Sequence, residues 1–171
     1  MKSEISPARE HSSPAGCLFF RQQFSSTERG ARLARLLAVQ QLVDWGWDRD
    51  GEGVADAALV VAELSTNAVV HGRLPGRGFL LSLALTAAAG GASVSLRIEV
   101  ADSRGELAPH PDTRNQPWDE HGRGLLIVQS LAARWGTVPR PPSGKTVWAV
   151  IDLADGGASR PGPVHSVPCV G

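Results

Sequence analysis

The spacing of apolar residues changes along the chain, and each spacing predicts a type of secondary structure. Apolar side chains that recur every three or four residues predict three helices, at 28–45, 54–71 and 125–133. Short apolar or alternating runs predict five strands, at 17–24, 79–86, 93–101, 135–138 and 146–153. The first helix starts after Thr27, a residue type that caps helices. Its apolar stripe has four members: Leu33, Leu36, Leu37 and Val43.

Strands that follow one another directly determine the expected fold. The order is strand, two helices, two strands, helix and two strands. This order favours an antiparallel or mixed sheet with helices on one face over the strict alternation of a doubly wound fold. We therefore expect an α/β (α+β) two-layer sandwich with a mixed, mostly antiparallel sheet.

Three segments fall outside this pattern. Residues 102–121 contain prolines and no periodicity, which is typical of a functional loop or lid. The polar ends, 1–16 and 154–171, have the composition of disordered tails. The sequence thus predicts one domain over residues 17–153.

Composition narrows the classes of function. The 171 residues carry 17 basic and 17 acidic side chains, so the basic excess of a dedicated nucleic-acid-binding domain is absent. Cys17 and Cys169 have neither metal-ligand spacing nor a disulfide pattern. We find no secretory signal and no apolar run near the ~20 residues that span a bilayer. A cytoplasmic protein that binds neither nucleic acid directly nor membranes is expected.

The helix 54–71 carries three polar side chains along one stripe. Glu63, Asn67 and His71 are spaced four residues apart and therefore face the same side. A carboxylate and an amide oxygen one turn apart suit Mg²⁺, and Glu63 can accept a proton beside that ion. A solvated helix face gives the same pattern, and a His before Gly72 is also how helices end. The apolar residues around the triplet favour a site.

Asp102 ends the strand predicted at 93–101. A carboxylate in this position either caps a turn or, if buried, accepts a hydrogen bond from an exocyclic amine such as that of adenine. The residues alone leave both interpretations open.

The third candidate is the run Gly122, Arg123, Gly124, Leu125, ahead of a predicted helix. Glycines let backbone amides approach an anion, and the helix dipole adds to the attraction. A dinucleotide-binding fingerprint is excluded because Ile127 occupies the place of its third small residue.

The run 143–146 imitates the end of a P-loop. That motif needs a glycine where Pro139 stands, and a helix where a strand is predicted. Lys145 is therefore not interpreted as a phosphate anchor.

Taken in order, these motifs resemble the conserved boxes of the GHKL ATPase superfamily. The run VVAELSTNAVVHG at 60–72 and the run GRGLLIV at 122–128 are similar to the anti-sigma-factor serine/threonine kinases, which are histidine-kinase-like ATPases of partner-switching systems. The resemblance covers about residues 17–153. It implies a Bergerat-type fold in which ATP lies between the helices and the sheet.

The resemblance also implies roles for single residues. Asn67 would coordinate Mg²⁺, Glu63 would be the catalytic base, and Asp102 would hold the adenine amine with Thr146 near it. Other residues that it places at the nucleotide are His71, Gly105, Gly122, Arg123, Gly124 and Leu125. The implied reaction moves the γ-phosphoryl group of ATP to a serine of an antagonist protein. The implied partners are that antagonist, a sigma factor and a second copy of the chain.

One departure keeps an alternative open. The superfamily favours D-x-G-x-G, whereas this chain has Arg104 and Glu106 at the two glycine positions, with Gly105 between them. A noncatalytic, nucleotide-gated protein-binding module is the alternative function. A sensor-kinase catalytic domain is disfavoured because the chain has no room for a phosphoacceptor domain. Arg29, Arg32 and Arg35 form a basic ridge, which is either a solvated face or a docking site for an acidic partner.

Overall fold

The predicted order of elements is confirmed. The computed structural model describes residues 17–71, 76–87, 93–103 and 120–153, and for 120–123 the backbone alone. The elements are β1 (Cys17–Ser25), α1 (Glu28–Asp44), α2 (Glu52–His71), β2 (Gly78–Ala87), β3 (Val94–Asp102), α3 (Glu120–Leu131), β4 (Arg134–Pro139) and β5 (Lys145–Leu153).

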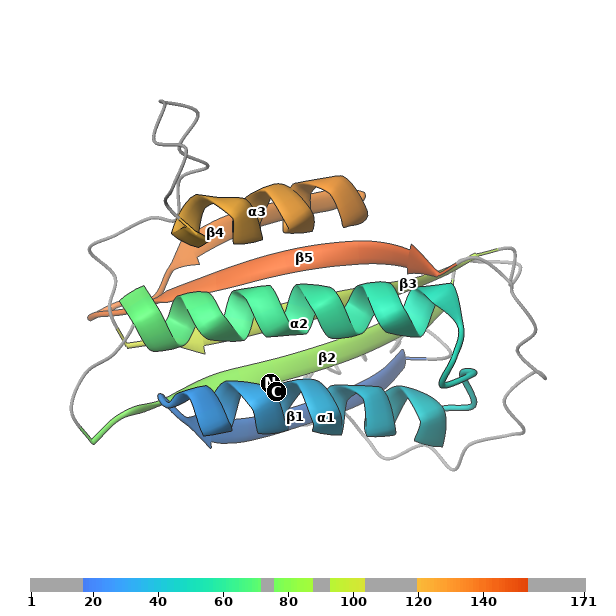
Figure 1. The fold of residues 1–171 in the computed structure, drawn as a ribbon, viewed down its shortest axis with the longest axis horizontal. Coiled ribbons are helices and arrows are strands. Elements are labelled where there is room, and N and C mark those ends of the chain that lie inside the picture. Colours follow the sequence, from blue (N-terminus) through green and yellow to red (C-terminus); the bar gives the residue numbers. More distant parts are fainter. Residues whose placement is uncertain (1–16, 72–75, 88–92, 104–119, 154–171) are drawn as a thin grey trace, which may run out of the picture.

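The strands form one sheet in the order β1-β2-β3-β5-β4. Every neighbouring pair is antiparallel, so the expectation of a mixed sheet is corrected to a fully antiparallel one among the described strands. The three helices lie over one face of the sheet, with α2 in the middle (Figure 1). The two-layer α+β sandwich is as predicted.

The core lies between α2 and the central strands. Strand residues alternate between the two faces of a sheet, and the apolar set of each of β2, β3 and β5 points at the helices. Leu83, Ile98 and Ala149 are fully buried there, as are Val60 and Val61 of α2. Because the helices cover one face only, the opposite face keeps polar side chains such as Arg97 and Glu99, which form an ion pair at 2.7 Å.

The apolar stripe used to predict α1 does not face the core. Leu33, Leu36 and Leu37 are 44%, 48% and 42% exposed. The buried face consists of small residues and one larger side chain: Gly30, Ala31, Ala34, Ala38 and Leu42. Small side chains let α1 pack closely against the sheet and α2, which leaves the leucines outside. The predicted cap is confirmed, because the Thr27 hydroxyl accepts the Gly30 N–H at 3.0 Å.

Helix α3 begins earlier than predicted. It starts at Glu120 rather than at residue 125, so Gly122 and Gly124 lie inside the helix and not ahead of it. Glycine is a poor helix former, so helix propensity alone does not predict the first turn of this helix.

Helix α2 is also long and apolar enough to cross a membrane by length and composition, with a window of mean hydropathy 1.4. The expectation that no apolar run approaches the length of a membrane span is therefore corrected for this helix. Seven of its residues are buried: Val54, Ala57, Val60, Val61, Leu64, Ser65 and Ala68. Helix α2 is therefore accounted for as the core helix of the sandwich.

Candidate functional site

Four elements bring their ends together at one end of the sandwich. The last turns of α2, the end of β3, the start of β5 and the first turns of α3 lie at the left of Figure 1. Most of the residues singled out in the sequence lie on these four ends. The site is thus built from segments that are far apart in the chain.

Glu63 lies on α2 and is partly buried against α3. A Cβ atom built on Gly124 would lie 3.3 Å from the Glu63 Cδ and closer still to its Oε2. The backbone of α3 therefore lies close against the Glu63 carboxylate, and a side chain at position 124 would force the carboxylate to shift. Burial raises the pKa of Glu63 above its ordinary value of 4.5, because desolvation penalises the charged form.

Asn67 follows one turn after Glu63 on the same face of α2. Its Nδ2 is buried and has no hydrogen-bond partner among the residues that the structure describes. A buried amide donor left unpaired costs about 1–3 kcal/mol, which a ligand oxygen would offset. The side chain is therefore suited to an oxygen-rich ligand such as a phosphate with its cation.

The donor set fits Mg²⁺ bound together with phosphates, rather than a metal held by the protein alone. Within the described ranges, no group of three or more His, Cys, Asp and Glu side chains is placed to hold a metal ion. Mg²⁺ commonly takes one or two protein oxygens and completes its shell with substrate phosphates and water. Asn67 would supply such an oxygen through Oδ1.

Asp102 is a buried carboxylate, and its partner is a residue to which the sequence analysis assigned no role. Lys145 lies directly opposite Asp102 in the β3–β5 register. Its Nζ is 3.0 Å from Asp102 Oδ2 and 3.3 Å from Oδ1, and the two side chains are 5% and 3% exposed. The turn-cap interpretation of Asp102 therefore gives way to a buried ion pair.

Thr146 lies next to Lys145 on β5 and pairs with Ala101 instead of Asp102. Because successive strand residues point to opposite faces, the Thr146 side chain is directed to the face away from Asp102. The expectation that Thr146 accompanies Asp102 is corrected, and Lys145 holds that position. The signal that would have found it is the cross-strand register, which the sequence alone does not contain.

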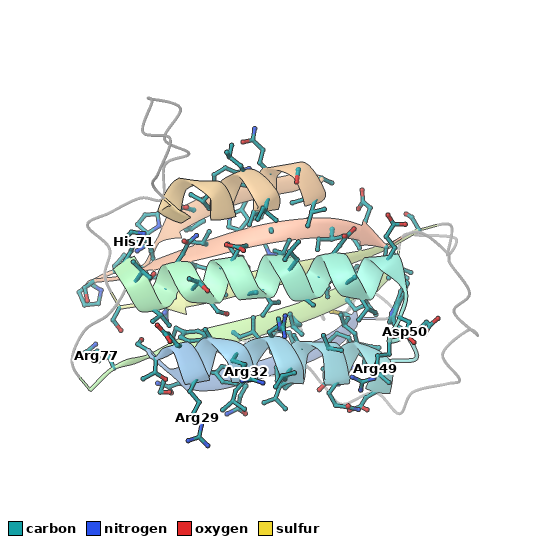
Figure 2. The ribbon with its side chains drawn as sticks, viewed as in Figure 1. Arg29, Arg32, Arg49, Asp50, His71 and Arg77 are labelled. Carbon is teal, nitrogen blue, oxygen red and sulfur yellow. The ribbon has the colours of Figure 1, made fainter. Side chains whose placement is uncertain are left out.

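The remaining candidates are placed less centrally. His71 is the last residue of α2 and is partly exposed at the same end of the molecule (Figure 2). The Leu125 side chain is only 3% exposed, so any contact with a ligand would use its backbone. Gly122 and Arg123 lie in the first turn of α3, where the structure describes the backbone alone. Gly105 lies outside the described residues.

The sheet is antiparallel and is covered by helices on one face. A carboxylate and an amide lie on its central helix, beside the glycine-containing first turns of another helix. This is the architecture of a nucleotide-binding α+β domain. The family model of the histidine kinase-like ATPase domain matches residues 24–151, which is well over half of the chain. The chain therefore belongs to the histidine kinase-like ATPase domain family. Membership in this ATPase domain family implies ATP binding.

A solved structure supports the fold. The crystal structure of the RsbU and RsbW domains of Rv1364c from Mycobacterium tuberculosis is similar, with a TM-score of 0.54 and 19% sequence identity over 80% of this chain. This chain spans 33% of the length of that one. A comparison with curated protein sequences finds no significant match.

Proposed function

We propose that the protein is an ATP-dependent serine/threonine kinase that also acts as an anti-sigma factor in a cytoplasmic partner-switching system. The observation that carries this proposal is the contact of Gly124 with the Glu63 carboxylate, one turn from Asn67. It brings a candidate base, a candidate metal ligand and a helix start that suits phosphates to one place. The name of the structural neighbour includes an RsbW domain, which supports a regulatory role.

In the proposed reaction, a serine hydroxyl of the antagonist attacks the γ-phosphorus of ATP. The bond between this phosphorus and the β–γ bridging oxygen breaks, ADP leaves, and Glu63 accepts the serine proton. Asn67 would hold Mg²⁺, which supplies neutralisation of the phosphate charge. The start of α3, with Gly122 and Gly124, directs its positive dipole end at the phosphates. Positioning and charge stabilisation are the main contributions expected of a protein in phosphoryl transfer.

The test is incubation of the protein with labelled Mg-ATP and candidate antagonist proteins, beside Glu63→Ala. Label on a serine of one antagonist, present with wild type and lost in the variant, is the expected result. Absence of transfer with both proteins, despite bound ATP, would contradict the kinase activity.

That last outcome would support the second candidate function, a nucleotide-gated binding module without catalysis. Arg104 and Glu106, which stand where the superfamily favours glycines, favour it. Calorimetry with ATP and with partner proteins separates the two functions, since the module binds both without phosphate turnover.

Gly124→Ala tests the contact between α3 and the proposed base. The new methyl group would displace the Glu63 carboxylate, which is the movable end of its side chain. We expect a fall in phosphoryl transfer of about 10- to 100-fold, since misplacing a reacting group by ~1 Å costs about that much. Stability should change by less than about 1 kcal/mol, because alanine is also the better helix former.

The measurements are the transfer rate with labelled ATP and the urea unfolding curve. Gln129→Ala, on the exposed side of α3, is the matched control and should leave both unchanged. Wild-type transfer in Gly124→Ala would show that this contact does not position the base.

Charge reversal at Arg32 tests the proposed partner surface. Arg29, Arg32 and Arg35 are exposed on α1, beside the exposed leucines of the same helix. Arg29 points away from α2 into solvent (Figure 2). If an acidic partner docks there, Arg32→Glu should weaken its binding at least about tenfold and reduce the salt dependence of the association.

The measurement is calorimetry or surface binding with the antagonist and the sigma factor at two salt concentrations. Arg134→Glu, on the edge strand β4, is the control for a change in overall charge. Equal affinities for wild type and Arg32→Glu would assign the ridge to an ordinary solvated face.

A further inference from the structure

The buried ammonium of Lys145 is the feature that the proposed reaction does not use. Its side chain is 5% exposed and contacts both carboxylate oxygens of Asp102. Lysine is rarely so buried, and replacing a buried ion pair by apolar residues of similar volume is often neutral or stabilising. Stability alone therefore does not account for a lysine in this position.

The fold holds this pair at the end of the sheet where the site lies. Asp102 and Lys145 are cross-strand partners on the face that the helices cover. Gly144 precedes Lys145 with φ +111°, and a Cβ atom on it would collide with the Asp102 carbonyl oxygen. The turn between β4 and β5 thus lies close against Asp102.

The pair presents a hydrogen-bond donor directly beside an acceptor. An ammonium carries three N–H donors and a carboxylate has about four lone-pair directions, so their mutual contact does not exhaust either group. The edge of adenine offers the complement, with the N6 amine as donor next to the ring nitrogen N1 as acceptor.

We propose that Lys145 is a second residue that recognises the base of the nucleotide, donating to adenine N1 while Asp102 accepts from N6. This inference rests on the ATP site of the proposed function. Lys145 is then a specificity residue. The ion pair recognises one edge of the base, with Asp102 as the hydrogen-bond acceptor and Lys145 as the donor.

The test combines a change in the ligand with a change in the protein. ATP and 1-deaza-ATP, in which N1 is replaced by C–H, are titrated by calorimetry with Mg²⁺ into wild type and K145M. Wild type is expected to bind 1-deaza-ATP about tenfold or more weakly than ATP, as for loss of a hydrogen bond from a charged donor. K145M is expected to bind the two nucleotides equally, each about as weakly as wild type binds 1-deaza-ATP.

A second variant separates recognition from folding. K145M removes the Lys145 cation from beside the Asp102 carboxylate, whereas D102A/K145M removes both charged groups and introduces no donor that could reach N1. This double variant should fold, as checked by circular dichroism, and should also bind the two nucleotides equally.

The experiment distinguishes a failure of the proposed role of Lys145 from a failure of the proposed function. Equal binding of ATP and 1-deaza-ATP by wild type, or a wild-type preference for ATP retained in either variant, would overturn the role of Lys145. Wild type that binds no ATP at all would overturn the proposed function itself.

Discussion

Replacing Glu63 by glutamine should lower the rate of phosphoryl transfer by about 10²- to 10⁴-fold, which is the usual contribution of a general base. Glutamine has nearly the shape of glutamate and fits the same space beside Gly124, so the contact with α3 is kept. It cannot accept the proton of the attacking hydroxyl. Binding of Mg-ATP, measured by calorimetry, should change by less than about tenfold, because Asn67 and the start of α3 are untouched.

The pH dependence gives a second readout of the same residue. The base works only when ionised, and burial raises the pKa of Glu63 above 4.5. Single-turnover transfer in wild type should therefore rise with pH through an acid limb that lies above 4.5. The residual rate of Glu63→Gln should lack this limb.

The raised pKa also has a defined effect on folding. The native state holds the Glu63 proton more tightly than the unfolded chain does. This group therefore favours folding at low pH, and that contribution is lost as pH rises from about 4.5 through the raised native value. In urea titrations across the same pH range, the free energy of unfolding of wild type relative to Glu63→Gln should therefore fall as the pH rises.

Asp56→Asn is the matched control for Glu63→Gln. Asp56 lies on α2 two turns before Glu63, on a similar face of the helix, and is also partly buried. It is outside the proposed site and should leave transfer and its pH profile unchanged. If both variants behave like wild type, Glu63 is not the base.

The fold was largely predictable because its signals are local. Helix α2 and the strands β2 and β3 each carry their own periodicity, and directly successive strands favour antiparallel pairing. Glu63 and Asn67 were found because helical spacing alone places them on one face.

The sequence predictions that were wrong concern features that depend on side-chain packing or on strand register. Whether Leu36 or Ala34 of α1 faces the core is decided by how closely the helix approaches its neighbours, and the small residue is the buried one. Helix propensity predicts a helix boundary at Gly124, because propensity does not include the Glu63 carboxylate that occupies the space beside this residue.

Lys145 was missed for a related reason. A shift of one residue in register exchanges the two faces of a strand, so only the observed pairing shows that Lys145, and not Thr146, faces Asp102.

Removal of the Asp102 carboxylate is the change expected to cost the most stability. Asp102→Ala leaves the Lys145 ammonium buried at 5% exposure without the carboxylate that lies 3.0 Å away. Breaking a buried pair by removing one partner typically costs about 3–5 kcal/mol. Urea unfolding should show a loss of this size.

Two further variants decide whether this loss comes from the lysine charge. D102A/K145M removes both charged groups, so it should recover most of the stability lost in Asp102→Ala. Asp152→Ala removes an exposed carboxylate of the same sheet, whose Oδ1 accepts the Ser95 hydroxyl at 2.8 Å, and should cost less than about 1 kcal/mol. A loss in Asp102→Ala no larger than in Asp152→Ala would mean that the ammonium leaves the interior when its partner is absent. Full recovery in the double variant, together with weakened ATP binding, would instead indicate that the pair is kept for recognition of the nucleotide, because its removal then costs function and not stability.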